Sequence, residues 1–221
     1  MINLYKYILF DFDGTLINTN KLIVYSLNET AKMFIKRPLE QNELFAILGK
    51  PLEEQAYLIT SEHCSAAIDF YKHTYKINQH SMIRQFPGVT KMLRKLKKMG
   101  CMIGIVSSKG RRGLERCMSK FNFSDYIDTI ISAYDVEKRK PSSEPALKAI
   151  DELKADKEQS ILIGDSPYDI QCGKNASIRT GLVKWTIFPV DKILDLNPDY
   201  YFRNPRHIVN TVSQSIVSNI F

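Results

Sequence analysis

Two aspartates one residue apart end the first apolar run of the chain. Asp11 and Asp13 lie in the segment ILFDFDGTLINTN, which covers residues 8–20. In an extended chain, side chains two positions apart point to the same side, so the two carboxylates share a face and repel each other. A bound cation would offset this repulsion. The pattern therefore predicts a cation-binding site at the end of a buried strand.

Other polar residues follow apolar runs further along the chain. They include two hydroxyls, a basic stretch and two more carboxylates, namely Ser107, Ser108, residues 138–141, Asp165 and Asp169. Open α/β sheets bind ligands at the carboxyl ends of their strands, so these groups are expected to meet at one edge. Carboxylate and hydroxyl oxygens are hard ligands that suit Mg²⁺ shared with a phosphate. The sequence predicts a Mg²⁺ site there.

The elements that must position these residues are short apolar runs that alternate with helical patterns. Five runs read as strands, at residues 7–12, 102–107, 127–132, 160–164 and 180–184. Their near-continuous hydrophobicity is typical of strands covered on both faces, as in a parallel sheet. Helices between them show clear ends, such as Ser166-Pro167 at a start and Gly100 after an apolar stripe. The expected fold is α/β, with a Rossmann-like parallel sheet.

One interval breaks this alternation. About seventy residues after the first strand contain helical patterns and no convincing strand, at residues 21–36, 40–48, 52–61 and 65–77. The simplest organisation is a small helical domain inserted into the core. We expect a Rossmann-like core at residues 1–17 and 83–221, with an inserted α-helical cap domain at residues 18–82.

Composition limits the classes of function. The 221 residues are 44% hydrophobic and 25% charged, with a net charge of +7, which favours anionic partners. The four cysteines are scattered and predict reduced thiols in a cytoplasmic protein. No apolar run approaches the roughly 20 residues of a membrane span. The basic stretch at 91–98 has no interleaved aromatic residues, so no nucleic-acid partner is expected. The oligomeric state is left open.

The order of these motifs resembles the haloacid dehalogenase-like hydrolase superfamily, in particular its phosphoglycolate phosphatase and pyrophosphatase-like branch with a helical cap. The matching motifs run through nearly the whole chain and read, in order, DFDGTLINTN, IVSSK, KP, GDSPYDI, CGKNASIRTGLV and PDYYFRNPRHI. The resemblance implies a Mg²⁺-dependent phosphatase acting on a small phosphorylated metabolite or pyrophosphate.

The resemblance also implies roles for individual residues. Asp11 would be the nucleophile that forms an aspartyl-phosphate, and Asp13 would protonate the leaving oxygen and then deprotonate the attacking water. Mg²⁺ would be held by the carboxylates of Asp11 and Asp165 and by the main-chain carbonyl of Asp13. Asp169 would orient these ligands or join them through water.

Four further positions are implied to contact phosphate or substrate. Ser107 and Lys140 would hold the transferring phosphoryl oxygens, and Ser108, which stands where relatives often have asparagine, is a second phosphate-binding candidate. Lys50, in the sequence LGKPL, falls where related caps often present a basic residue to substrate.

Two alternatives stay open. A sugar-phosphate mutase of the same superfamily would pass the phosphoryl group to another hydroxyl. Related mutases often carry a histidine just after the first motif, whereas the first histidine here is His63. A catalytically idle binding protein would be expected to lack Asp11, Asp13, Lys140 or Asp165, and all four are present.

Overall fold

The computed structural model describes residues 5–213 and divides the chain into two compact units. Unit 1 contains the chain up to Leu16 and from Gln85 onward, and unit 2 contains Ile17–Arg84. The boundaries expected from the sequence, 17/18 and 82/83, lie one and two residues from these positions.

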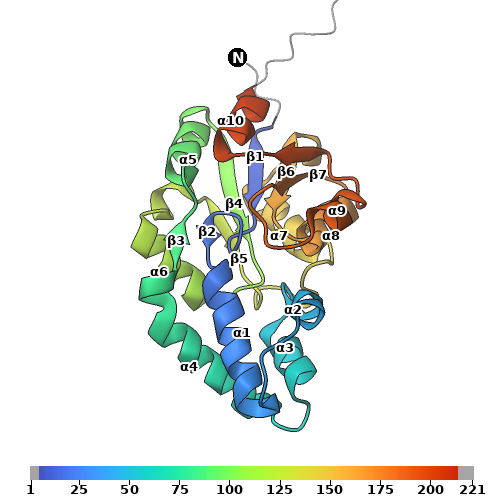
Figure 1. The fold of residues 1–221 in the computed structure, drawn as a ribbon. Coiled ribbons are helices and arrows are strands. Elements are labelled where there is room, and N and C mark those ends of the chain that lie inside the picture. The colour runs from blue at the N-terminus through green and yellow to red at the C-terminus, as the bar shows by residue number, and fades with distance from the viewer. Residues whose placement is uncertain (1–4, 214–221) are drawn as a thin grey trace, which may run out of the picture. The chain divides into compact units, whose positions relative to one another are not determined.

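A six-stranded sheet forms the centre of unit 1 (Figure 1). Its order is β5-β4-β1-β6-β7-β8, and all of its neighbouring strands are parallel. The strands are β1 Tyr7–Phe10, β4 Met102–Val106, β5 Thr129–Ile131, β6 Ser160–Gly164, β7 Arg179–Val183 and β8 Tyr200–Phe202. This arrangement confirms the predicted α/β, Rossmann-like core. Strand β8 lies within PDYYFRNPRHI, the last of the segments that carry the family resemblance.

Helices of unit 1 cover the sheet. They are α5 Val89–Lys98, α6 Arg111–Phe121, α7 Glu144–Leu153, α8 Pro167–Asn175, α9 Val190–Leu194 and α10 Pro205–Ser213. Figure 1 shows α5 on one side of β1 and β4, and α7 and α8 on the other. Side chains from α7 and α8 form one hydrophobic cluster with Tyr7 and Leu9. Ile8 and Phe10, which alternate with them, are fully buried on the opposite face. Two-sided burial is why this strand is apolar at every position.

The ends of two helices follow from their sequences. Ser166 and Asp169 form a reciprocal capping box at the start of α8, with Pro167 in the first turn. The apolar stripe of α5 is buried at Val89, Met92, Leu93 and Leu96. The chain after α5 turns at Gly100, whose φ of 79° is the left-handed conformation that glycine adopts without steric cost.

Unit 2 is helical, as its sequence pattern indicates. Its helices are α1 Asn20–Ile35, α2 Gln41–Ile47, α3 Leu52–Ile59 and α4 Cys64–Met82. Helix α1 packs on α4 and α3, and Phe34 meets Phe70 edge-to-face with ring centroids 6.2 Å apart. Strands β2 Ile17–Asn18 and β3 Arg84–Gln85 pair with each other. The sequence did not predict them, because two residues are too few to show a strand period. Whether this unit acts as a cap stays a prediction.

Within residues 5–213, the structure has no helix with the length and apolar character needed to cross a membrane.

Candidate active site

Three adjacent strands bring the predicted residues to one edge of the sheet. Asp11 follows β1, Ser107 follows β4 and Asp165 follows β6, and β1 lies between the other two strands. The strand order reverses at β1, and such a switch point opens a crevice at the carboxyl ends of the strands. Asp11 is held at this level by its amide, which donates to the Ile163 carbonyl at 2.9 Å.

Lys140 occupies the centre of the site. Its ammonium donates to Asp11 Oδ1 at 2.7 Å, to Asp169 Oδ1 at 2.6 Å and to the Val106 carbonyl at 3.0 Å. All three N–H donors of the ammonium thus have an acceptor. The Lys140 side chain is only 4% exposed, so these bonds form in a region that excludes water. The loop after β5 therefore delivers a fixed positive charge to the end of β1.

Three buried carboxylates surround this lysine. Oxygen atoms of Asp11, Asp165 and Asp169 lie within 4.8 Å of one another. When all three are ionised, the single ammonium of Lys140 leaves two negative charges uncompensated. Burying unpaired charge is costly. A divalent cation with oxygen ligands supplies the missing charge, so the residues present fit such an ion.

The pKa values of these groups reflect the crowding. Burial raises the pKa of Asp11 to about 7, with a contribution from the Asp169 carboxylate, although Lys140 opposes the shift. Burial, followed by the charges of Asp11 and Asp169, raises the pKa of Asp165 well above its ordinary value. Burial alone would lower the pKa of Lys140, but the two carboxylates it contacts outweigh this and raise it. Lys140 is therefore a permanent cation.

Gly14 allows Asp165 to approach the turn after β1. A Cβ atom at Gly14 would lie 2.4 Å from Asp165 Oδ2, closer than any real contact. The φ of Gly14 is 88°, which also disfavours a side chain. The Asp165 carboxylate thus packs directly on the backbone of this turn.

Asp169 has both carboxylate oxygens engaged. Oδ1 accepts from Lys140, and Oδ2 accepts from the Ser166 amide at 3.0 Å and the Ser166 hydroxyl at 2.6 Å. These bonds fix the lysine from the start of α8. The geometry suits a residue that orients the other site residues.

Asp13 is placed differently from the other carboxylates. Its side chain is not in the cluster of three and instead pairs with Lys109, at 3.0 and 3.2 Å from the ammonium to the two oxygens. Both side chains are partly exposed, at 18% for Asp13 and 16% for Lys109. No role was predicted for Lys109, although its position directly after Ser107 and Ser108 could have indicated one.

The remaining predicted residues divide between the two units. Ser107 is buried, and its hydroxyl accepts from the Lys109 amide at 3.2 Å. Ser108 is half-buried at the same strand end. Lys50 lies in unit 2 between α2 and α3, where it forms an ion pair with Glu54. A role for Lys50 in substrate binding stays a prediction.

Known proteins resemble this chain along most of its length. A relative from Clostridium perfringens, provisionally named pyrophosphatase PpaX, is 36% identical over 209 residues, covering 95% of this chain and 98% of the relative. Pyrophosphatase PpaX of Halalkalibacterium halodurans is 30% identical over 205 residues, covering 93% and 95%. A Bacteroides fragilis structure, provisionally named a haloacid dehalogenase-like hydrolase, has a TM-score of 0.82 and 27% identity, covering 90% and 97%.

The family assignment rests on the sequence as well as on the fold. The model of the family described as haloacid dehalogenase-like hydrolase matches residues 8–183, a stretch that begins in β1 and ends with β7. The match includes Asp11, Asp13, Lys140, Asp165 and Asp169. This chain belongs to the haloacid dehalogenase-like hydrolase family.

Proposed function

We propose that this chain is a divalent-metal-dependent phosphatase that hydrolyses pyrophosphate or a small phosphate ester. The observation that carries the proposal is the buried group formed by Asp11, Lys140 and Asp165, in which one candidate nucleophile contacts a fixed cation beside a further carboxylate. Because relatives of this chain are named pyrophosphatase PpaX, pyrophosphate is the first substrate that we propose to test.

Asp11 is the proposed nucleophile. A carboxylate oxygen attacks phosphorus, a new oxygen–phosphorus bond forms, and the bond to the leaving oxygen breaks. Lys140 neutralises charge on Asp11 and on the transferring phosphoryl group, and Ser107 donates to the same group. Ser108 is a second proposed phosphate contact. Because Lys140 is already fixed by Asp169 and Val106, little reorganisation is needed during the reaction.

Asp13 is the proposed general acid and base. It protonates the leaving oxygen, and then takes a proton from the water that cleaves the aspartyl-phosphate. Its partial exposure and its position two residues after Asp11 suit contact with solvent and substrate. Lys109, which pairs with both Asp13 oxygens, holds this carboxylate in place before substrate binds.

The proposed cofactor is Mg²⁺. Asp11 and Asp165 would hold it together with the main-chain carbonyl of Asp13, and Asp169 would support these ligands. When bound, the ion offsets carboxylate repulsion and stabilises charge on the phosphoryl oxygens.

Substitution of Asp11 tests the proposal. Wild-type protein with Mg²⁺ should release phosphate from pyrophosphate, and Asp11→Asn should lower kcat by roughly 10⁴-fold or more, as for other catalytic nucleophiles. Asp195→Asn, at an exposed position after α9, is the matched control and should retain activity. Full activity of D11N with normal Mg²⁺ binding would show that Asp11 is not the nucleophile.

A substrate panel separates the alternatives. Phosphoglycolate, sugar phosphates and nucleotides should be compared with pyrophosphate, with free phosphate as the measured product. Isomerised sugar phosphate from a hexose 1-phosphate would indicate the mutase. No turnover of any member of the panel would favour a binding protein.

A further inference from the structure

The connection between β7 and α9, residues 184–189, contacts the candidate site. It follows residue 183 in the sequence, where the match to the family model ends. Two of its side chains form hydrogen bonds with the site. Trp185 Nε1 donates to the Thr15 carbonyl at 3.0 Å. Thr186 Oγ1 donates to the Asp165 carbonyl at 2.6 Å and lies 3.3 Å from Asp165 Oδ2. One short loop thus reaches both the turn after β1 and the end of β6.

The orientation of the Thr186 hydroxyl is fixed by its neighbours. The oxygen also accepts from the Phe188 amide at 2.9 Å, which leaves the single hydroxyl proton to be donated toward Asp165. A β-branched side chain has few rotamers, so holding this geometry costs little conformational entropy. Thr186 therefore constrains both the backbone and the carboxylate of Asp165.

Asp165 is confined from two directions. The backbone at Gly14 packs against its carboxylate on one side, and Thr186 contacts it on another. The side chain is buried and, within residues 5–213, forms no ion pair. A carboxylate that is unpaired and tightly bounded is arranged to receive a ligand.

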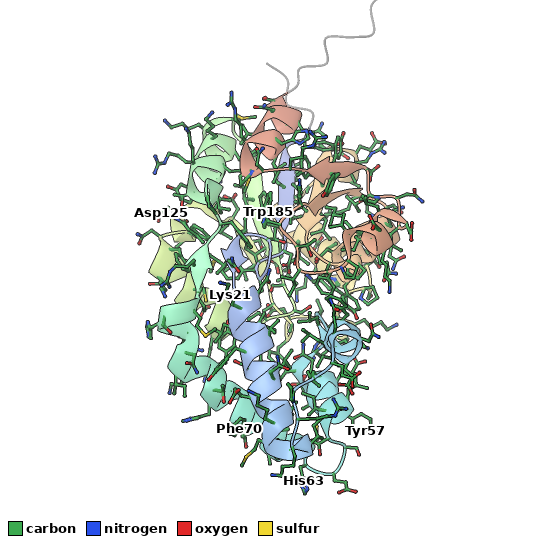
Figure 2. The ribbon with its side chains drawn as sticks, in the orientation of Figure 1. Lys21, Tyr57, His63, Phe70, Asp125 and Trp185 are labelled. Atoms are coloured by element: carbon green, nitrogen blue, oxygen red, sulfur yellow. The ribbon has the colours of Figure 1, made fainter. Side chains whose placement is uncertain are left out.

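Trp185 contacts the turn after β1, where it bonds Thr15, whereas Thr186 bonds Asp165. Its indole N–H is satisfied by Thr15, the residue after Gly14, and its ring packs against Phe86 with centroids 5.8 Å apart. Figure 2 labels Trp185 among the side chains of unit 1. Restraint at Thr15 fixes the backbone of Asp13 and Gly14 next to it.

We propose that Thr186 and Trp185 are positioning residues, which hold Asp165 and the turn at residues 13–15 at the separation that a divalent cation requires. The proposal rests on the proposed function, because it assigns Asp165 and the Asp13 carbonyl to that cation.

Metal affinity is the direct measurement, and it does not require turnover. Trp185 is the single tryptophan of the chain, so its fluorescence reports on this loop as Mg²⁺ is added to metal-free protein, with calorimetry as an independent readout. Thr186→Val should weaken Mg²⁺ binding by about 10–100-fold, the usual effect of removing a group that orients a metal ligand. Thr186→Ser keeps the hydroxyl and should restore most of the affinity.

A matched control lies at the other end of β7. Thr180 also bonds an aspartate, with its hydroxyl 3.0 Å from Asp199 Oδ2. Thr180→Val removes a partly buried threonine–aspartate bond that lies away from the site and should lower the melting temperature without changing Mg²⁺ affinity. Trp185→Phe, measured by calorimetry, keeps an aromatic ring and loses the N–H. It should weaken Mg²⁺ binding by a smaller factor than T186V, because it acts only through the main chain.

The outcomes separate the two proposals. Equal Mg²⁺ affinity in wild type, T186V and W185F would overturn the positioning roles and leave the proposed function intact. Absence of any Mg²⁺ binding by wild type would overturn the proposed function itself. If T186V does not fold, T186A and T186S provide the same comparison, since they differ only in the hydroxyl.

Discussion

The two edges of the parallel sheet differ in how far their ion pairs are exposed to solvent. At the carboxyl edge, Lys140 and Asp11 form an ion pair in which the side chains are 4% and 8% exposed. At the amino edge, Arg179 at the start of β7 pairs with Asp199, and these side chains are 62% and 26% exposed. The second pair is solvated and needs no further partner. The first is buried among additional carboxylates, an arrangement that destabilises the fold unless another cation is bound.

This difference in burial indicates that the carboxyl edge, and not the amino edge, carries the functional site. Buried, crowded ionisable groups with strongly shifted pKa values are typical of functional sites. Solvent-exposed pairs contribute little to stability and are common on any surface. The contrast can be tested by making the same change at both edges.

The largest effect is expected from replacing the basic residue of each ion pair, Lys140 at the carboxyl edge and Arg179 at the amino edge. Lys140→Met leaves Asp11 and Asp169 buried without their shared partner, and should lower the free energy of unfolding by about 3–5 kcal/mol. Its phosphatase kcat should fall by at least about 10²-fold. Arg179→Met should cost roughly 0–1 kcal/mol and leave kcat unchanged. Urea unfolding and steady-state kinetics measure both. Similar stability losses in the two variants would contradict the contrast between the edges.

A second comparison uses two glycines with the same backbone conformation. Gly14 and Gly100 have φ values of 88° and 79°, but a Cβ at Gly100 would meet nothing within 4 Å. Gly100→Ala should therefore cost only the left-handed strain, about 1–2 kcal/mol.

Gly14→Ala adds a clash with the Asp165 carboxylate to that strain. It should weaken Mg²⁺ binding and lower kcat, whereas G100A should change neither. Calorimetric Mg²⁺ titration of the two variants makes the comparison. Normal Mg²⁺ affinity in G14A would show that the position of Asp165 is not critical.

A smaller effect is expected from pH. Burial raises the pKa of Asp11 from 3.8 to about 7 in the folded, cation-free site, so we expect a proton on this carboxyl below pH 7 that would compete with the proposed Mg²⁺. Apparent Mg²⁺ affinity should fall by roughly tenfold per pH unit as the pH is lowered from 7 to 5. Calorimetry across this range measures it, and a flat profile would contradict the raised pKa.

The same shift predicts the sign of the effect on stability. The folded protein binds the proton more tightly than the unfolded chain between pH 4 and 7. The metal-free protein should therefore lose stability as the pH rises through this range, and the Asp11 contribution should be fully lost above about pH 7. Melting temperatures in a chelator test this, and added Mg²⁺ should reverse the loss.

Much of the fold was predictable because its signals are local. The apolar runs that became β1, β4, β5, β6 and β7 are continuous, and helix ends such as the Ser166 cap have specific residue preferences. The paired strands β2 and β3 could not be predicted, since each has only two residues and its partner lies nearly seventy positions away. Helices α6 and α9 were also not singled out.

The candidate site was predictable in its membership but not in its pairing. Asp11, Ser107 and Asp165 follow strand ends, and parallel strands carry such residues to one edge. Which cation pairs with which acid depends on loops whose paths are not encoded by any period. Lys109 pairs with Asp13 across 96 positions of sequence, and Thr186 reaches Asp165 across 21.

The sequence by itself determined which chemical groups are present and which strand ends carry them, because residue type and periodicity are properties of short segments. Only the tertiary structure decided that Lys140 bridges two acids, that Gly14 leaves room for Asp165, and that Thr186 contacts the same carboxylate. Those relations depend on distances of a few ångströms between separate segments, and packing of the whole unit sets such distances.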